Sequence, residues 1–77
     1  MTVRALVKQF CRDRIAGSGY FRGSMVIDHV GAHLGCVSAD TVLRSLRDLR
    51  RRGEVDYHVE DVHKSLYFVW RVSDYVR

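Results

Sequence analysis

The segment from residue 38 to residue 53 most constrains the fold of this chain, because its sequence describes one short helix with two different faces. At about 100° per residue, its aliphatic side chains share roughly a third of the helix circumference. They are Val42, Leu43, Leu46 and Leu49, with Ala39 beside them. Such a stripe packs against a core. We therefore predict a helix over about residues 39–52 with one buried side.

The ends of this helix are also marked in the sequence. Ser38 is a good N-cap, because its hydroxyl can accept a hydrogen bond from a first-turn amide. Gly53 can adopt the left-handed conformation that ends many helices.

The other side of the helix is polar and rich in arginine. Its members are Asp40, Thr41, Arg44, Asp48 and Arg51, flanked by Ser45, Arg47 and Arg52. The planar fork of arginine suits phosphates and guanine edges, which favours a nucleic-acid partner. An ordinary solvated charged face has the same composition, so both interpretations stay open at this point.

Length and composition predict one folded domain over residues 1–77. The chain is 47% hydrophobic and has no proline, which is typical of a compact protein. We find neither an apolar run of membrane-spanning length nor a signal peptide, so we expect a cytoplasmic protein without a membrane partner. Cys11 and Cys36 are then expected to stay reduced and to act as small apolar fillers.

The net charge of +4 is unevenly distributed. Residues 39–53 hold five arginines and two aspartates, whereas residues 54–63 hold four carboxylates and no lysine or arginine. Positive charge is therefore concentrated on one predicted element.

A first helix is predicted over about residues 3–16. Arg4, Lys8 and Arg12 recur on one side at a spacing of four residues, where like charges repel. A bound polyanion would relieve this repulsion, which makes them candidate phosphate contacts. A solvated flank paired with Asp13 is the alternative.

A glycine-rich loop containing Tyr20 and Phe21 follows, and we expect both rings to pack inward. Ser24 is the expected N-cap of a second helix over about residues 24–34, with Val26, Ile27, Val30 and Leu34 on one face. Only a short turn separates it from the arginine-rich helix, so the two helices must cross steeply.

The pattern then changes from helical to alternating, which predicts a hairpin over about residues 54–72. One strand alternates at Val55, Tyr57 and Val59, and the next places Leu66, Phe68, Trp70 and Val72 on one side, with Tyr67 and Val69 opposite. Residues 60–65 form the expected loop, and the tail at 73–77 is expected to dock through Tyr75 and Val76.

This order of elements resembles that of winged helix-turn-helix DNA-binding domains. The segment SMVIDHVGAHLGCVSADTVLRSLRDLRRRGEVDY is similar to the family's support helix, turn, recognition helix and entry into the wing. The resemblance covers residues 3–72 and implies an α+β fold, namely a three-helix winged helix-turn-helix with a C-terminal two-stranded β-hairpin wing.

The resemblance also implies a function, that of a small sequence-specific protein binding double-stranded DNA, a transcriptional regulator or accessory factor of bacterial or phage type. It places Asp40, Thr41, Arg44, Ser45 and Asp48 in the major groove. Arg44 is the strongest candidate for reading a guanine. Ser38 and Thr41 are expected at phosphates near the helix start, with Arg47, Arg51 and Arg52 at further phosphates.

The expected wing departs from the family pattern, because Glu60 and Asp61 stand where basic residues usually occur. An acidic wing suits a protein partner or a second copy of the chain, reached through the wing or the tail. The alternative function is therefore a protein-interaction module, in which Tyr57, Tyr67, Val69 and Tyr75 would matter more than Arg44.

His29, His33 and Cys36 have the spacing of half a zinc site, but the sequence offers no evident fourth ligand, and we expect solvated or core-edge histidines instead. We also find no phosphate-binding loop, nucleophile elbow or paired-carboxylate motif. We therefore expect neither catalysis nor a bound metal or cofactor.

Overall fold

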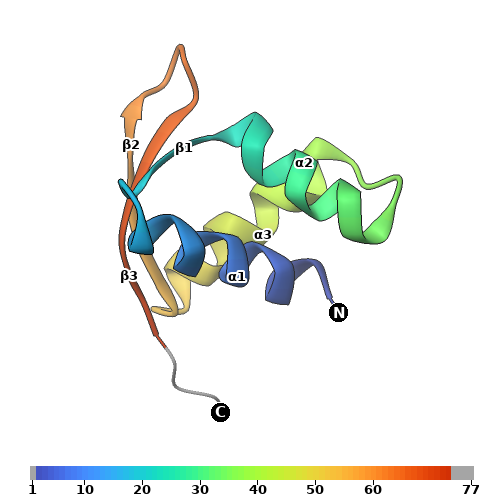
Figure 1. Cartoon of the computed structure of the whole chain (residues 1–77), viewed down its shortest axis with the longest axis horizontal. Coiled ribbons are helices and arrows are strands. Elements are labelled where there is room, and N and C mark those ends of the chain that lie inside the picture. Colours follow the sequence, from blue (N-terminus) through green and yellow to red (C-terminus); the bar gives the residue numbers. More distant parts are fainter. Residues whose placement is uncertain (1, 74–77) are drawn as a thin grey trace.

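The computed structural model describes residues 2–73 and shows an α+β fold. Its elements are α1 (Val3–Ala16), β1 (Tyr20–Arg22), α2 (Gly23–Leu34), α3 (Ala39–Arg51), β2 (Val55–Asp61) and β3 (Leu66–Val72). The three helices gather on one side of the sheet, and the β2–β3 hairpin projects beyond them (Figure 1).

The aliphatic stripe of α3 anchors this helix in the core. Val42, Leu46 and Leu49 are at most 1% exposed, as predicted, whereas Leu43 is only partly buried and Ala39 is exposed. The three buried residues join Leu6, Val7, Phe10 and Cys11 of α1, Val26 and Val30 of α2, and Phe21, Val55, Tyr57 and Val69 of the sheet. The core is therefore shared by all six elements.

The caps of α3 are also as predicted. The Ser38 hydroxyl accepts a hydrogen bond from the Thr41 amide at 3.2 Å. Gly53, just past the helix, has a φ of +76°, which an L side chain rarely adopts. The predicted N-cap of α2 is wrong by two residues, because Arg22 rather than Ser24 is the N-cap and the helix begins at Gly23.

The hairpin predicted over about residues 54–72 is confirmed as β2 and β3, but the sheet that contains it has three antiparallel strands, in the order β1-β3-β2, instead of two. The extra strand is the segment that we expected to be a loop. Phe21 pairs with Tyr67 across the sheet and is 1% exposed, whereas Tyr20 is 44% exposed. The expectation that both rings pack inward therefore holds for Phe21 alone.

The register of the hairpin decides which side of each strand faces the helices. Tyr57 pairs with Val69, and both side chains are nearly fully buried. On the opposite side of β3, Trp70 is 51% exposed. At the end of α2, Leu34 is 40% exposed, so this helix buries a narrower stripe than the sequence suggested.

Two ion pairs connect α1 to α3 and to the residue that precedes β2. The Arg4 guanidinium donates to Asp48 of α3 at 2.9 Å, and the Lys8 ammonium donates to Glu54 at 3.2 Å. The expected docking of Tyr75 and Val76 lies outside the described residues. Between residues 2 and 73, no helix is both long and apolar enough to cross a membrane.

Candidate nucleic-acid interface

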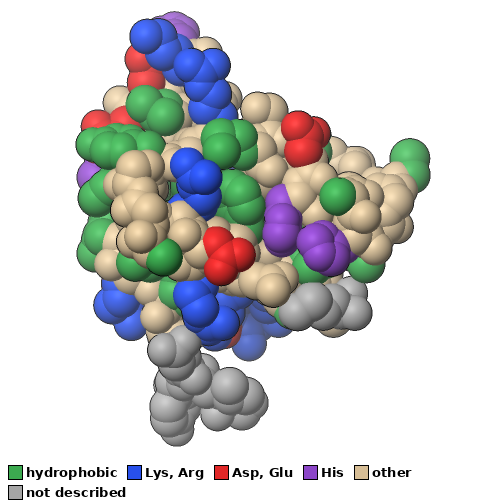
Figure 2. All heavy atoms as spheres, in the orientation of Figure 1, with side chains coloured by type: hydrophobic (Ala, Val, Ile, Leu, Met, Phe, Trp, Pro, Cys, Tyr) green, Lys and Arg blue, Asp and Glu red, His purple; other side chains and the backbone are tan. Residues whose placement is uncertain are grey.

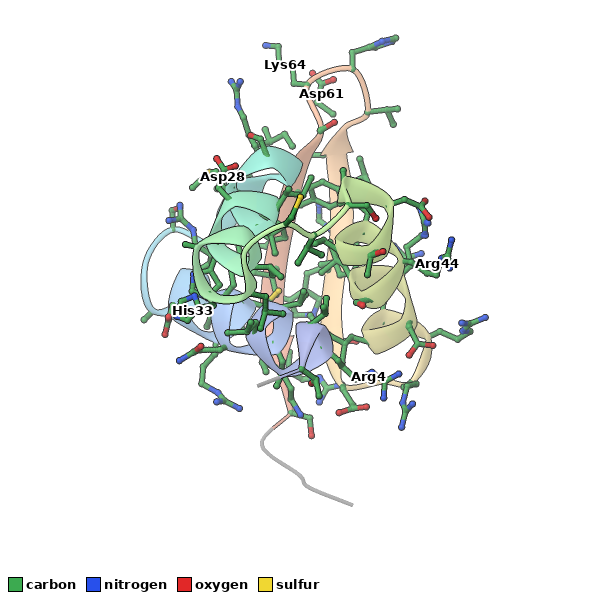
Figure 3. All side chains as sticks on the ribbon, turned by 90° about the vertical axis from the view of Figure 1, so that its right-hand side faces the viewer. Arg4, Asp28, His33, Arg44, Asp61 and Lys64 are labelled. Atoms are coloured by element: carbon green, nitrogen blue, oxygen red, sulfur yellow. The ribbon has the colours of Figure 1, made fainter. Side chains whose placement is uncertain are left out.

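The polar face of α3 lies on the surface. The side chains of Arg44 and Arg51 are 73% and 80% exposed. Arg44 projects away from α1 and α2, well clear of the hairpin tip marked by Asp61 and Lys64 (Figure 3). The hairpin therefore does not cover the face that the sequence singled out.

Arg44 makes one ion pair on its own helix. Its guanidinium donates to Asp40, one turn earlier, at 2.5 Å. Exposed pairs of this spacing stabilise a helix by only about 0.3 to 0.5 kcal/mol. The guanidinium can therefore exchange Asp40 for a stronger partner at little cost.

Asp48 turns toward α1 instead of lying in the exposed face. Its carboxylate is 23% exposed and accepts from both Arg4 and Arg51, with Arg52 at 3.9 Å. The hydrogen bond from Arg51 and the nearby charges of Arg4, Arg51 and Arg52 lower the pKa of Asp48. The expected position of this carboxylate in the major groove is therefore not supported by the geometry.

Ser38 and Thr41 lie side by side at the start of α3. Their hydroxyl oxygens are 2.7 Å apart, and the Ser38 oxygen also caps the helix. Both residues are exposed, whereas Ser45 is only half-exposed. The first turn of α3 is thus accessible, and Ser45 lies at the margin of the polar face.

The remaining candidates have partners that fix their directions. Arg52 donates to Glu54 at 3.1 Å, and the same carboxylate accepts from Lys8. The Lys8 hydrogen bond is the largest cause of the lowered pKa of Glu54. Arg4 and Lys8 therefore act as links between elements, while Arg12 is an exposed cation on α1 that also makes a contact within the chain.

Arg50 is a further cation of this surface that the sequence analysis did not select. Its guanidinium carbon lies 5.0 Å from the centroid of the Tyr57 ring, as in a cation–π contact. Its place in the sequence, four residues after Leu46 and seven after Leu43, puts it at the border of the aliphatic stripe. That spacing was the available signal that Arg50 would lie along the helix–sheet boundary.

A groove separates α3 from the hairpin. It has a volume of about 360 Å³ and is lined by Leu43, Leu46, Arg47, Arg50, Arg51, Tyr57, Val59 and Tyr67. Arginines of α3 and apolar side chains of both elements therefore meet in one depression of the surface.

The acidic hairpin tip is organised by its own contacts. The Asp61 carboxylate accepts from the Lys64 amide at 3.2 Å and so closes the turn. Glu60 lies 2.7 Å from His58 Nε2. These contacts give both carboxylates a local structural role.

The outer side of the sheet carries a row of aromatic rings. Tyr20 and Phe68 have centroids 4.8 Å apart, and His58 lies 5.7 Å from Phe68 and 5.3 Å from Trp70. Figure 2 shows hydrophobic side chains reaching the surface along the side of the molecule that the sheet forms. Among the side chains expected to contact a protein partner, Tyr57 and Val69 are buried and Tyr67 packs against the core, whereas Tyr20 and Trp70 are exposed.

The rings of the two α2 histidines, His29 and His33, are in contact, with centroids 4.7 Å apart and planes tilted by 50°. His33 Nδ1 lies 3.0 Å from the His29 carbonyl oxygen. Within residues 2–73, no three metal-ligating side chains converge on one point. Cys11 and Cys36 are both free thiols, the first buried and the second exposed.

Comparisons of the chain with protein-family models, with curated proteins and with solved structures found no match.

Proposed function

We propose that this protein binds double-stranded DNA as a winged helix-turn-helix domain and inserts the polar face of α3 into the major groove. One observation carries the proposal: α3 is anchored by the buried side chains of Val42, Leu46 and Leu49, while its arginine-bearing face is open to solvent. A helix held in this way fits the major groove, which is about 12 Å wide.

The arrangement around α3 supports this reading. Residues 35–38 form the whole connection between α2 and α3, which is the length of the turn in helix-turn-helix motifs. In these motifs the second helix contacts base edges. The β2–β3 hairpin, extended to three strands by β1, is compatible with a wing.

The charged residues of this face have different roles in DNA binding. Arg44 is held near the start of α3 by a weak pair with Asp40, so a guanine edge can replace that carboxylate. Arg47 and Arg51 lie one and two turns further along the same face and suit phosphates. Asp48 faces α1, which removes the carboxylate that would most oppose this contact.

The test is binding of the whole chain to a fluorescein-labelled duplex of random sequence, followed by anisotropy between 50 and 200 mM salt. With about three phosphates neutralised, the logarithm of affinity falls with the logarithm of salt at a slope of about −3. The Arg51→Gln variant should reduce the magnitude of that slope by about 1.

Lys64→Gln is the matched control, because it removes one positive charge at the hairpin tip, away from Arg44 (Figure 3). Its slope should equal that of the parent protein. A flat salt response, or equal losses in the two variants, contradicts binding through α3.

A second candidate function is docking of a protein on the aromatic row of the sheet, favoured by the 51% exposure of Trp70. A second copy of this chain is the partner that can be tested directly. Sedimentation over a concentration series should then show association in the parent protein and its loss in Trp70→Ser. Monomers at every concentration would contradict self-association.

A further inference from the structure

The groove between α3 and the hairpin combines an apolar floor with a cationic rim. Leu43, Leu46 and Val59 supply aliphatic surface, and the rings of Tyr57 and Tyr67 complete the lining. The guanidinium-bearing residues are Arg47, Arg50 and Arg51. Its volume of about 360 Å³ lies at the lower end of the range of small-molecule sites.

The positive charge at this groove is incompletely neutralised. Arg51 is paired with Asp48 at 3.0 Å. Neither Arg47 nor Arg50 has a carboxylate within ion-pairing distance among residues 2–73, whereas Arg4 and Arg44 each have one and Arg52 has two. Two guanidinium groups thus remain available to an anion beside apolar surface.

Tyr57 connects the two parts of the groove. Its ring underlies the Arg50 guanidinium, and its burial keeps the pKa of the phenol above the ordinary value despite the nearby charges of Arg50 and Arg47. The hydroxyl therefore stays neutral near pH 7 and does not compete with an incoming anion for the arginines.

We propose that this groove binds a small aromatic anion, with a flat ring against the apolar floor and a carboxylate or sulfonate on Arg47 and Arg50. The planar guanidinium matches such oxyanions with two parallel hydrogen bonds. A flat ring also suits the groove because Val59 is 41% exposed and the Tyr67 ring is only partly buried, so both leave apolar surface at the groove.

Binding of the anion in the groove is expected to compete with DNA binding. This competition rests on the proposed function. Arg47 and Arg51 line the groove and are the residues assigned to phosphates, so a bound anion and a DNA backbone require the same side chains. The aromatic anion therefore displaces duplex DNA, and duplex DNA displaces the anion.

The probe is 1-naphthoate, added to isotopically labelled protein and followed by amide chemical shifts. Saturable shifts are expected around Tyr57, Val59 and Tyr67. The neutral 1-naphthamide and the ring-free acetate are expected to bind at least about tenfold more weakly, because each lacks half of the recognised chemistry.

Three variants locate the site. Arg50→Gln should weaken naphthoate binding about tenfold, since it removes a charged donor. Val59→Phe should do the same by filling the groove while all arginines remain. Arg44→Gln, on α3 but outside the groove, should bind naphthoate as the parent does and lose affinity for DNA.

The outcomes separate the two proposals. Absence of saturable shifts, equal binding of naphthamide, or unchanged binding by Arg50→Gln and Val59→Phe overturns the groove site, whatever the protein does with DNA. Naphthoate binding by a chain that binds no duplex supports the site and refutes the antagonism together with the proposed function.

Discussion

Arg4 and Asp48 join the first and third helices by a hydrogen-bonded ion pair of 2.9 Å across 44 positions of sequence. The pair turns Asp48 away from the exposed face of α3, where a helical wheel places it. The same contact therefore stabilises the packing of α1 on α3 and leaves the outer face more positive.

This relationship predicts loss of stability in acid. The folded-state pKa values of Asp48 and Glu54 lie below the ordinary values of 3.8 and 4.5, because arginine and lysine partners favour the charged carboxylates. A depressed pKa contributes stability above the ordinary pKa, and this contribution is lost as pH falls through the folded-state value.

The free energy of unfolding, measured by urea denaturation, should therefore fall as pH drops below about 4.5. In the Asp48→Asn, Glu54→Gln double variant this fall should be smaller, and stability at pH 7 should be lower than in the parent. An unchanged acid profile in the double variant would show that other groups control the transition.

Substitution of Asp40 is expected to raise the affinity of the protein for duplex DNA. Asp40→Asn removes a carboxylate from the exposed face and frees Arg44 from its 2.5 Å partner. Affinity for a duplex should rise several-fold at low salt, since one repulsive charge is gone. Arg44→Gln should instead lower affinity and reduce discrimination between duplexes of different sequence, which competition titrations measure. Weaker binding by Asp40→Asn would indicate that the carboxylate itself contacts a base.

Gly19 predicts a strong local effect of adding one methyl group. Its φ is +83°, and a Cβ there would lie 2.7 Å from a Phe68 ring carbon and 2.8 Å from the Val69 carbonyl oxygen. Gly19→Ala should lower the free energy of unfolding by about 2 to 3 kcal/mol.

Two other glycines are controls for this measurement. Gly53 has a φ of +76°, but a Cβ there would meet no other atom within 4 Å. Gly53→Ala should therefore lower the free energy of unfolding by about 1 kcal/mol. Gly31 lies within α2, and a Cβ there would also meet no other atom. Gly31→Ala should therefore raise the free energy of unfolding by about 0.5 to 1 kcal/mol. Equal costs at Gly19 and Gly53 would contradict the close approach to β3.

The two thiols should differ in reactivity. Burial raises the pKa of the Cys11 thiol to about 12, whereas Cys36 is exposed. A disulfide reagent at pH 8 should titrate Cys36 quickly and Cys11 only after denaturation, because the thiolate is the reactive form. In Cys36→Ser the native protein should show no fast phase. A fast phase in that variant would mean that α1 opens readily.

The sequence predicted α3 well because independent signals agree there. The cap at Ser38, the aliphatic stripe and the stop at Gly53 all indicate the same helix, and the burial of Leu46 and Leu49 confirms it. The exposure of Arg44 follows from the same periodicity. Whether this face binds DNA stays a prediction.

The strand Tyr20–Arg22 was missed because three residues are too few to show an alternating pattern. Its pairing is with Leu66–Phe68, and a contact of that range leaves no local trace. β3 is apolar on both sides, so its sequence does not say which side faces inward. The register with Tyr57 decides that question.

The surroundings of Asp48 and Arg50 could not be predicted from the sequence for a related reason. A helical wheel gives angles around one helix, but it does not show which neighbours surround that helix. The Asp48 carboxylate is directed toward its partner Arg4 on α1. The Arg50 guanidinium lies over the Tyr57 ring of the sheet.

The pairing of β1 with β3 also sets the order in which a newly made chain can fold. Phe21 leaves the ribosome early, but its backbone partner Tyr67 is translated 46 codons later. Until then the first strand has no ladder to join, and its ring lacks the aromatic neighbour on which it stacks. Helices can form during translation, but the sheet closes only when synthesis has passed the second arm of the hairpin.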